Sequence, residues 1–419
     1  MKQYKKLNVL ILYIEAFVLA FVIVFALINP REKVVSDDMQ ALLEEENKQP
    51  IDRIEDEPEE VVVETHRYHY ELSEKASAKL AEMTLEEKIA QMYIVRPEEL
   101  MNIRQVVTAG NRTKNTINQY PVGGFIYSEL NFEDVDQTKK LVSGVMQLGV
   151  ERLGIPMYLA VKELGGDEFS PLAKNTGMEI QKPITELVAT GDVTQIQNSV
   201  KQIGTYLSDM GLNMNLAPVT DLSAGLNEEV DKMCFGNDAE FAKNAANITI
   251  KEYENSKITS VVRYFPEKSS AVFNEDTGLL VGTKTIEEHT ATDFVVCQGV
   301  IDEGAKVVML SNVVDESIAT DMMPASLSGE AIEYLRQTMG FEGIVITDSL
   351  SEENIANKYT AEEATIKAFE AGVDIIYDPA DFEKSYTALL NAVQNGDIAE
   401  AEVNERVGRI LTLKMDSME

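Results

Sequence analysis

The residues of this chain best suited to chemistry are one carboxylate and two lysines that follow apolar runs. Asp348 directly follows the run at 343–347, Lys162 follows that at 157–161, and Lys268 lies soon after that at 260–264. Taken alone, an aspartate at a strand end more often bonds the local backbone than attacks an electrophile, and a nearby lysine can pair with it. A lysine with a pKa near ~10.4 stays protonated at neutral pH and is a poor proton donor. The pattern fits either a reactive carboxylate or a structural ion pair.

Other groups near these positions could supply a proton. A carboxyl beside a second carboxylate has a raised pKa and can act as an acid. In so acidic a chain, however, we expect the nearby carboxyls to be solvated loop charges: Glu163, Asp167, Glu168 and Glu267. His289 lies in a helical pattern, and we expect it on the surface of that helix.

Apolar runs and the helical patterns between them predict the fold that positions these residues. Seven runs read as strands buried on both faces, at 122–127, 157–161, 213–217, 260–264, 306–310, 343–347 and 373–377. Helical spacing occurs at 132–153, 193–210, 239–255, 286–303, 327–339, 360–371, 382–395 and 398–415. Thr84-Leu-Glu-Glu87 reads as a capping box that opens an earlier helix. The order predicts a TIM-like (β/α)8 barrel over residues 71–419, with the eighth strand not located. A doubly wound open sheet is the alternative, but no phosphate-binding glycine pattern follows the first strand.

Charge and hydropathy predict where the barrel lies. The formal net charge of −34 argues against nucleic acid and against binding an anionic membrane through charge. Residues 9–28 are almost entirely apolar, and a helix of about 20 residues spans a bilayer core of roughly 30 Å. Lys2, Lys5 and Lys6 favour a cytoplasmic N-terminus. We therefore predict a single-pass plasma-membrane anchor at 1–30, an acidic linker at 31–70 and an extracytoplasmic barrel. A cleaved signal peptide is the alternative.

The sequence gives no sign of a metal or cofactor site. His66 and His69 form a His-x-x-His pair with no third ligand in view, so we expect both to be solvated. Cys234 and Cys297 are the only cysteines, and we expect two buried thiols, with a single bridge as the alternative.

Several segments, in order, resemble the N-terminal domain of glycoside hydrolase family 3, especially its bacterial β-N-acetylhexosaminidase branch. Their order and spacing carry the resemblance, which covers about residues 80–415. Met83-Thr-Leu-Glu-Glu-Lys-Ile-Ala-Gln-Met92 resembles the opening of that domain, Val122-Gly-Gly-Phe-Ile126 its first strand and Gly211-Leu-Asn-Met-Asn-Leu-Ala-Pro-Val-Thr-Asp221 its third. Phe235-Gly-Asn-Asp238, Pro324-Ala-Ser-Leu-Ser328, Gly340-Phe-Glu-Gly-Ile-Val-Ile-Thr-Asp348 and Ala371-Gly-Val-Asp374 follow in the family's order.

The resemblance implies a retaining mechanism, in which a carboxylate attacks the anomeric carbon and a loop histidine protonates the leaving oxygen. It places Asp348 at the position of the nucleophile. The family's donor loop reads Lys-His-Phe-Pro-Gly-His-Gly, whereas this chain has Arg263-Tyr-Phe-Pro-Glu-Lys-Ser269, with Lys268 at the donor histidine. Arg263 and Tyr264 replace the sugar-binding Lys-His pair, and Lys162 replaces a sugar-binding aspartate. Asp221 ends the third-strand motif, and we also assign it to substrate binding.

These departures lead to two hypotheses from different functional classes. In the first, the chain is a catalytically impaired β-N-acetylhexosaminidase homologue, a pseudoenzyme that binds cell-wall glycan or an envelope protein. In the second, it is an active retaining β-N-acetylhexosaminidase that releases terminal N-acetylglucosamine from peptidoglycan fragments, with Asp348 as nucleophile and a substitute acid. Losing a positioned general acid typically costs roughly 10²–10⁴ in rate, which favours the first.

Overall fold

Parallel strands arranged in a ring form the centre of the protein. The structure is a computed structural model that describes residues 67–416. The strands are β1 (Tyr93–Val95), β2 (Gly124–Ile126), β3 (Tyr158–Val161), β4 (Met214–Asn215), β5 (Thr259–Ser260), β6 (Val262–Phe265), β9 (Val307–Leu310), β11 (Ile344–Thr347) and β12 (Ile376–Tyr377). They pair in the orders β12-β1-β2-β3-β4-β5 and β11-β9-β6. Parallel bridges join Val219 to Arg263 and Ile346 to Ile375, so the pairings run round the whole ring. This is a TIM-like α/β fold.

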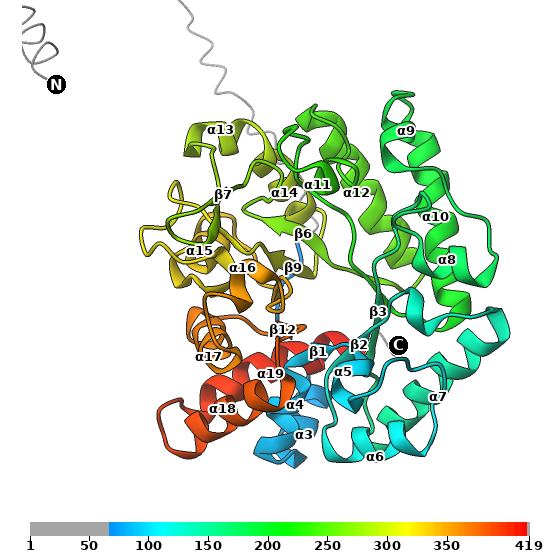
Figure 1. Ribbon diagram of the computed structural model, residues 1–419, viewed down its shortest axis with the longest axis vertical. Coiled ribbons are helices and arrows are strands. Elements are labelled where there is room, and N and C mark those ends of the chain that lie inside the picture. The colour runs from blue at the N-terminus through cyan, green and yellow to red at the C-terminus, as the bar shows by residue number, and fades with distance from the viewer. Residues whose placement is uncertain (1–66, 417–419) are drawn as a thin grey trace, which may run out of the picture. The chain divides into compact units, whose positions relative to one another are not determined.

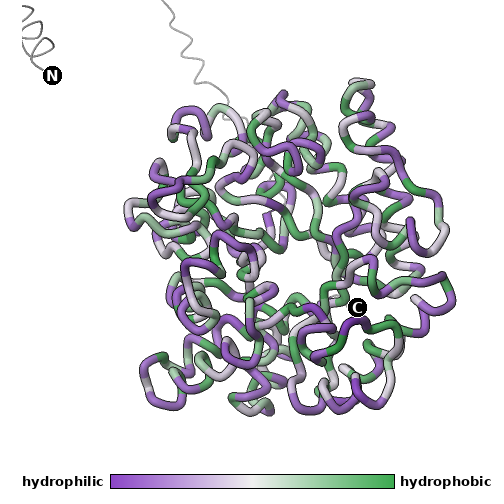
Figure 2. The backbone as a smooth tube through the Cα atoms, viewed as in Figure 1, coloured by the Kyte–Doolittle hydropathy of each residue, from purple (hydrophilic) through white to green (hydrophobic). Residues whose placement is uncertain are grey.

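Helices surround the ring, as Figure 1 shows. The longer ones are α7 (Val135–Leu153), α10 (Val193–Met210), α12 (Ala239–Asn255), α14 (Asp293–Asp302), α17 (Ala361–Ala371), α18 (Phe382–Gln394) and α19 (Glu400–Asp416). The shorter ones are α3 (Glu74–Glu82), α4 (Leu85–Gln91), α5 (Pro97–Met101), α6 (Asn111–Gln119), α8 (Pro171–Thr176), α9 (Ile184–Val188), α11 (Glu228–Asp231), α13 (Ile286–Ala291), α15 (Gly329–Glu333) and α16 (Glu353–Ala356). In Figure 2 apolar colour is concentrated on the central strands, and polar colour is frequent on the outer helices and loops. The strands are buried on both faces, which explains their continuous apolar runs.

The structure confirms most of the expected elements and shows where the sequence misled us. All seven expected strands and the Thr84 capping box are present. The missing eighth strand is β1, so the segment at 122–126 carries the second strand, not the first, and the motif at 211–221 carries the fourth, not the third. The helix expected at 286–303 is broken at Thr292, whose hydroxyl donates to the Glu288 carbonyl 2.6 Å away. The helix expected at 327–339 ends in a π turn at Tyr334–Thr338.

A small sheet outside the ring lies over one side of it. The antiparallel hairpin of β7 (Val272–Asn274) and β8 (Leu279–Val281) directly follows the loop that contains Lys268. β8 also pairs in parallel with β10 (Val313–Val314). This sheet brings two apolar side chains, Phe273 and Leu280, to the cavity described below.

The predicted membrane anchor and most of the acidic linker lie outside residues 67–416. Within that range, no helix combines the length and apolar character needed to cross a bilayer.

Candidate functional site

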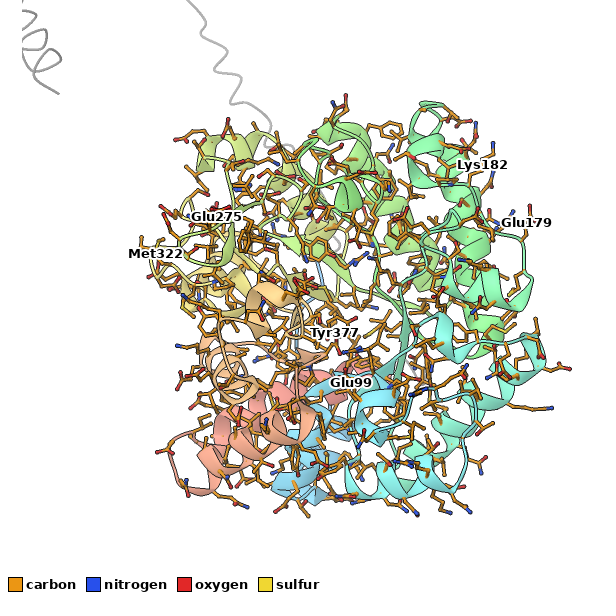
Figure 3. All side chains as sticks on the ribbon, viewed as in Figure 1. Glu99, Glu179, Lys182, Glu275, Met322 and Tyr377 are labelled. Atoms are coloured by element: carbon orange, nitrogen blue, oxygen red, sulfur yellow. The ribbon has the colours of Figure 1, made fainter. Side chains whose placement is uncertain are left out.

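A cavity of about 470 Å³ lies at the carboxyl ends of the strands, where barrel enzymes place their sites. Five of the six residues that the sequence assigned to the site line it: Lys162, Arg263, Tyr264, Lys268 and Asp348. They come from β6 and from the loops that follow β3, β6 and β11. Tyr377, at the end of β12, also lines the cavity and lies toward the middle of the barrel in Figure 3. In the same view Glu275, at the tip of the β7–β8 hairpin, lies at the outer edge.

Asp348 is fixed at the cavity wall by its own backbone and by two partners. It follows β11 directly, and its backbone N–H donates to the Leu310 carbonyl on β9 at 2.8 Å. Its Oδ1 accepts the N–H of Ser349 at 2.9 Å. Its Oδ2 accepts from the Lys268 ammonium at 2.6 Å. Both oxygens are therefore engaged, and the side chain is almost fully buried.

Lys268 joins two carboxylates in the cavity. Its Nζ lies 2.6 Å from Asp348 Oδ2 and 2.6 Å from Glu352 Oε1, and 5.0 Å from the centre of the Tyr264 ring. Burial alone lowers the pKa of this lysine, but the Asp348 charge, aided by Glu352, outweighs burial and holds the pKa well above its ordinary value. Lys268 therefore remains protonated at any physiological pH.

Glu352 is a site residue that sequence reasoning missed. Its Oε2 accepts from the Asn312 amide at 3.0 Å, and its other oxygen binds Lys268. Burial and the neighbouring Asp348 charge raise the pKa of Glu352, while Lys268 opposes that rise. Its position four residues after Asp348 was the available signal, because residues on one short loop after a barrel strand face the same cavity.

Arg263 and Tyr264 lie side by side on β6 and line the cavity. Arg263 Nη1 donates to the Tyr264 hydroxyl at 3.0 Å, and its Nη2 lies 3.6 Å from the Met233 sulfur. Burial raises the pKa of Tyr264 above its ordinary value, so its hydroxyl is neutral.

Lys162 follows β3 directly and lies in the loop after that strand. Its Nζ is 3.2 Å from Glu229 Oε1 and 5.1 Å from the centre of the Phe169 ring. Burial and then the positive charge of Arg263 lower the pKa of Lys162 to about 8. The same loop contains Gly165, with a φ of +99°, where an added Cβ would lie 2.6 Å from the Lys182 carbonyl oxygen. Glycine is required there by the backbone, whatever the loop binds.

Asp221 does not lie where substrate binding requires. The sequence placed it among the binding residues, but it is buried beneath the loop and does not line the cavity. Its Oδ1 accepts the N–H of Tyr264 at 3.0 Å, and its Oδ2 accepts those of Lys268 at 2.6 Å and Ser269 at 2.9 Å. Burial, with the charges of Glu267 and Asp293, raises the pKa of Asp221 to about 7. Asp221 therefore positions the loop and has no free oxygen for a ligand.

None of the four carboxyls considered as substitute acids lines the cavity. Asp167 and Glu168 are exposed, as expected. The expectation of solvation was wrong for Glu163 and Glu267, which are fully buried. Glu163 accepts from the Tyr206 hydroxyl at 2.8 Å, and burial raises its pKa to about 7. Glu267 accepts from backbone and hydroxyl groups of the two serines that follow Lys268.

His289 also differs from the expectation of a surface residue, because it is fully buried. Its Nε2 lies 2.7 Å from Asp315 Oδ2, and its ring stacks on Phe294. Burial opposes protonation, but the nearby carboxylates of Asp293 and Asp315 raise the pKa of His289 to about 9. This histidine belongs to a buried ion-pair layer, and it does not line the cavity.

The remaining predictions concern thiols and metals. Cys234 and Cys297 are both buried and unpaired, as expected. Among residues 67–416, no group of three histidine, cysteine or acidic side chains is placed to hold a metal ion. His69 is exposed, and His66 lies outside the described residues.

Comparison with known proteins assigns the barrel to a family. Residues 84–413 match the model of the glycosyl hydrolase family 3 N-terminal domain. β-Hexosaminidase A of Pseudoalteromonas piscicida is 23% identical over 335 residues, which cover 71% of this chain and 54% of that protein. β-Hexosaminidase LpqI of Mycobacterium tuberculosis is 24% identical over 340 residues, or 78% of this chain and 82% of that protein. The solved structure of a family 3 β-N-acetylglucosaminidase from a Paenibacillus species superposes with a TM-score of 0.72 at 26% identity, over 80% of this chain and 63% of that one. This chain thus spans about half the length of the first of these relatives. Fold, site position and sequence agree, and the chain belongs to glycoside hydrolase family 3, with β-hexosaminidases among its relatives.

Proposed function

We propose that this protein is a catalytically impaired β-N-acetylhexosaminidase homologue whose cavity binds a sugar of the cell-wall glycan. The observation that carries the proposal is the ammonium of Lys268, which lies 2.6 Å from both Asp348 Oδ2 and Glu352 Oε1. In the family pattern a histidine occupies the Lys268 position and supplies the proton.

Double displacement needs a free carboxylate oxygen and a separate proton donor. Here the ammonium engages one oxygen of Asp348, and the other oxygen accepts the N–H of Ser349. Lys268 cannot replace the histidine as donor, because its pKa lies well above the ordinary lysine value. Both steps of the reaction therefore lose a required group, at a cost of roughly 10²–10⁴ in rate for the acid alone.

The cavity nevertheless retains features suited to binding a sugar. Its volume of about 470 Å³ lies within the usual range for small-ligand sites. Tyr264, Phe273 and Tyr377 give it aromatic surface without any tryptophan. The names of the relatives support N-acetylglucosamine as the sugar. Docking of an envelope protein on this face is the other binding role that the proposal allows.

The proposed location is the outer face of the plasma membrane, and it rests on the sequence alone. The apolar segment at 9–28 and the preceding lysines favour a single-pass anchor with the barrel extracytoplasmic. Digestion of intact cells by an added protease tests this: the barrel is degraded if it lies outside, and protected if it lies inside.

A second candidate function, an active retaining hydrolase, is favoured by one observation. Glu352 lines the cavity beside Asp348, and burial and the Asp348 charge raise its pKa. A raised pKa suits a carboxyl to proton donation. In this case a bound sugar would have to displace Lys268 from between the two carboxylates.

A single assay separates the two candidates. Full-length protein in detergent is offered a chromogenic N-acetylglucosaminide from pH 4 to 9, with Asp348→Asn and Glu352→Gln as variants. We expect no turnover above the protein-free control for any form, together with measurable binding of N-acetylglucosamine by calorimetry. Turnover that is abolished in Asp348→Asn and falls by roughly 10²–10⁴ in Glu352→Gln would instead establish the active hydrolase.

A further inference from the structure

The guanidinium of Arg263 is buried in the cavity wall, and no carboxylate among residues 67–416 pairs with it. The residue is 2% exposed. Among the residues that the structure describes, its contacts are with the Met233 sulfur at 3.6 Å and with Tyr264, whose hydroxyl lies at 3.0 Å and whose ring centre lies 5.1 Å from Cζ, and all of these groups are uncharged. Its Nε–H has no hydrogen-bond partner among the residues that the structure describes.

Such an arrangement is unfavourable in isolation. Burying an ion is costly unless it is paired, and a buried donor without an acceptor adds a further penalty. The remaining charges of the cavity do not relieve it. Lys268 engages Asp348 and Glu352, Glu229 is bonded to Lys162, and Glu353 is exposed.

A second basic residue in the cavity increases the imbalance. Lys162 and Arg263 line the same cavity, and the pKa of Lys162 is lowered by burial and then by the positive charge of Arg263. Their mutual repulsion marks a region of the wall with excess positive charge. This contrasts with a chain whose formal net charge is −34.

We propose that the cavity takes an anionic sugar, whose carboxylate or phosphate group lies against Arg263 and Lys162. The inference rests on the proposed sugar-binding function and adds the charge of the ligand. A guanidinium offers a planar set of donors that matches two anionic oxygens, and Arg263 lines the cavity without an anionic partner among the described residues. Lys162 can contribute because its partner Glu229 is exposed and solvated, with a side chain 65% accessible.

The test compares a neutral sugar with anionic sugars of the same skeleton. Calorimetry on the full-length protein at pH 7 uses N-acetylglucosamine, N-acetylmuramic acid, N-acetylglucosamine 6-phosphate and inorganic phosphate. Since hydrogen bonds to charged groups contribute about 1.5–3 kcal/mol, we expect at least one anionic sugar to bind about 10- to 100-fold more tightly than the neutral sugar. The muramic acid and the sugar phosphate distinguish a carboxylate from a phosphate ligand. Inorganic phosphate reports binding of a free anion, and affinity equal to that of the sugars would overturn the inference.

Two variants make the test specific. Arg263→Gln should remove the preference for the anionic sugar, so that the affinity for the anionic sugar falls about 10- to 100-fold more than the affinity for the neutral sugar. Arg263→Lys keeps the charge and should retain part of the preference, which guards against a general folding defect in the first variant. Equal affinity for neutral and anionic sugars, or a preference unchanged in Arg263→Gln, would overturn this inference alone. If no sugar binds at all, the proposed function fails with it.

Discussion

The segment from Val262 to Ser270, which consists of β6 and the loop after it, has two sides with opposite chemical character. One side faces the cavity with Arg263, Tyr264 and Lys268. The other side faces a buried polar layer, where Asp221 accepts three backbone N–H groups from the loop. The cavity side departs from the family pattern, whereas the inner side has its hydrogen bonds satisfied.

The buried polar layer, called the inner layer below, continues beyond Asp221 through further hydrogen bonds and ion pairs of buried carboxylates. Glu267 accepts from Ser269 and Ser270, and Asp293 accepts from the N–H of Leu222 and from Lys284. His289 joins this layer through Asp315. Because carboxylates hold the backbone from beneath, side chains on the cavity side can be replaced without loss of the loop. If the proposed function is right, this barrel keeps its fold while the reaction is lost, and the predictions below test that separation.

The largest effect should follow from Asp221→Ala on the inner side. The change leaves the buried N–H groups of Tyr264, Lys268 and Ser269 without an acceptor, and each unsatisfied group costs about 1–3 kcal/mol. We expect the free energy of unfolding to fall by about 4 kcal/mol, measured by denaturant titration. Glu353→Ala, which removes an exposed carboxylate at the cavity, is the matched control and should change it by less than about 0.5 kcal/mol. Similar losses in both variants would remove the distinction between the two sides.

A smaller and pH-dependent loss should follow from Lys268→Met on the cavity side. The change leaves Asp348 and Glu352 close together without the ammonium that joins them. Breaking a buried ion pair costs roughly 3 kcal/mol, so we expect that loss near pH 8. Near pH 5 most of it should be recovered, because the raised pKa of Glu352 allows one carboxyl to take up a proton. Denaturant titrations at the two pH values measure the difference, and an equal loss at both would contradict the explanation by charge.

The sequence predicted the residues that face the cavity better than the residues of the buried inner layer, and the reasons are physical. Loops after barrel strands meet at one end of the barrel, so strand order alone brings Lys162, Lys268 and Asp348 together. The direction of a side chain within its loop is not encoded in that order. Asp221 was therefore misassigned, and the burial of His289 was missed because its partner Asp315 comes from a distant loop.

The fold was predicted from continuous apolar runs, and the exceptions were short elements. β1 has three residues and begins two positions after α4 ends, so it shows no periodicity of its own. The position of Glu352 four residues after Asp348 places it near the cavity, but the sequence does not distinguish it from the exposed Glu353 beside it. Three-dimensional proximity to Lys268 is what identifies it.

The third prediction concerns how the stability that His289 contributes from the inner layer changes with pH. Contacts with Asp293 and Asp315, against the effect of burial, raise the pKa of His289 from 6.5 to about 9, so the folded state favours its charged form. The resulting stabilisation is complete below pH 6.5 and is lost as the pH rises through about 9. Relative to His289→Gln, the wild-type free energy of unfolding should decline over this window by at most about 1.4 kcal/mol per pH unit. Parallel curves for the two proteins in denaturant titrations would show that His289 does not titrate in this way.

The smallest effect should come from the titration of Lys162, which lines the cavity. It concerns the affinity of the protein for an anionic sugar bound near Arg263. Burial and the Arg263 charge lower the pKa of Lys162 to about 8, while Glu229 and Asp348 raise it. Lys268 stays protonated through this range, since Asp348 and Glu352 hold its pKa high. Affinity for the anionic sugar should therefore fall by less than about 10-fold between pH 7 and pH 9, as Lys162 loses its proton. Lys162→Gln should bind more weakly at pH 7 and show a flat profile in calorimetry at pH 7, 8 and 9. A decline that persists in this variant would assign the titration to another group, whereas a flat profile would assign it to Lys162.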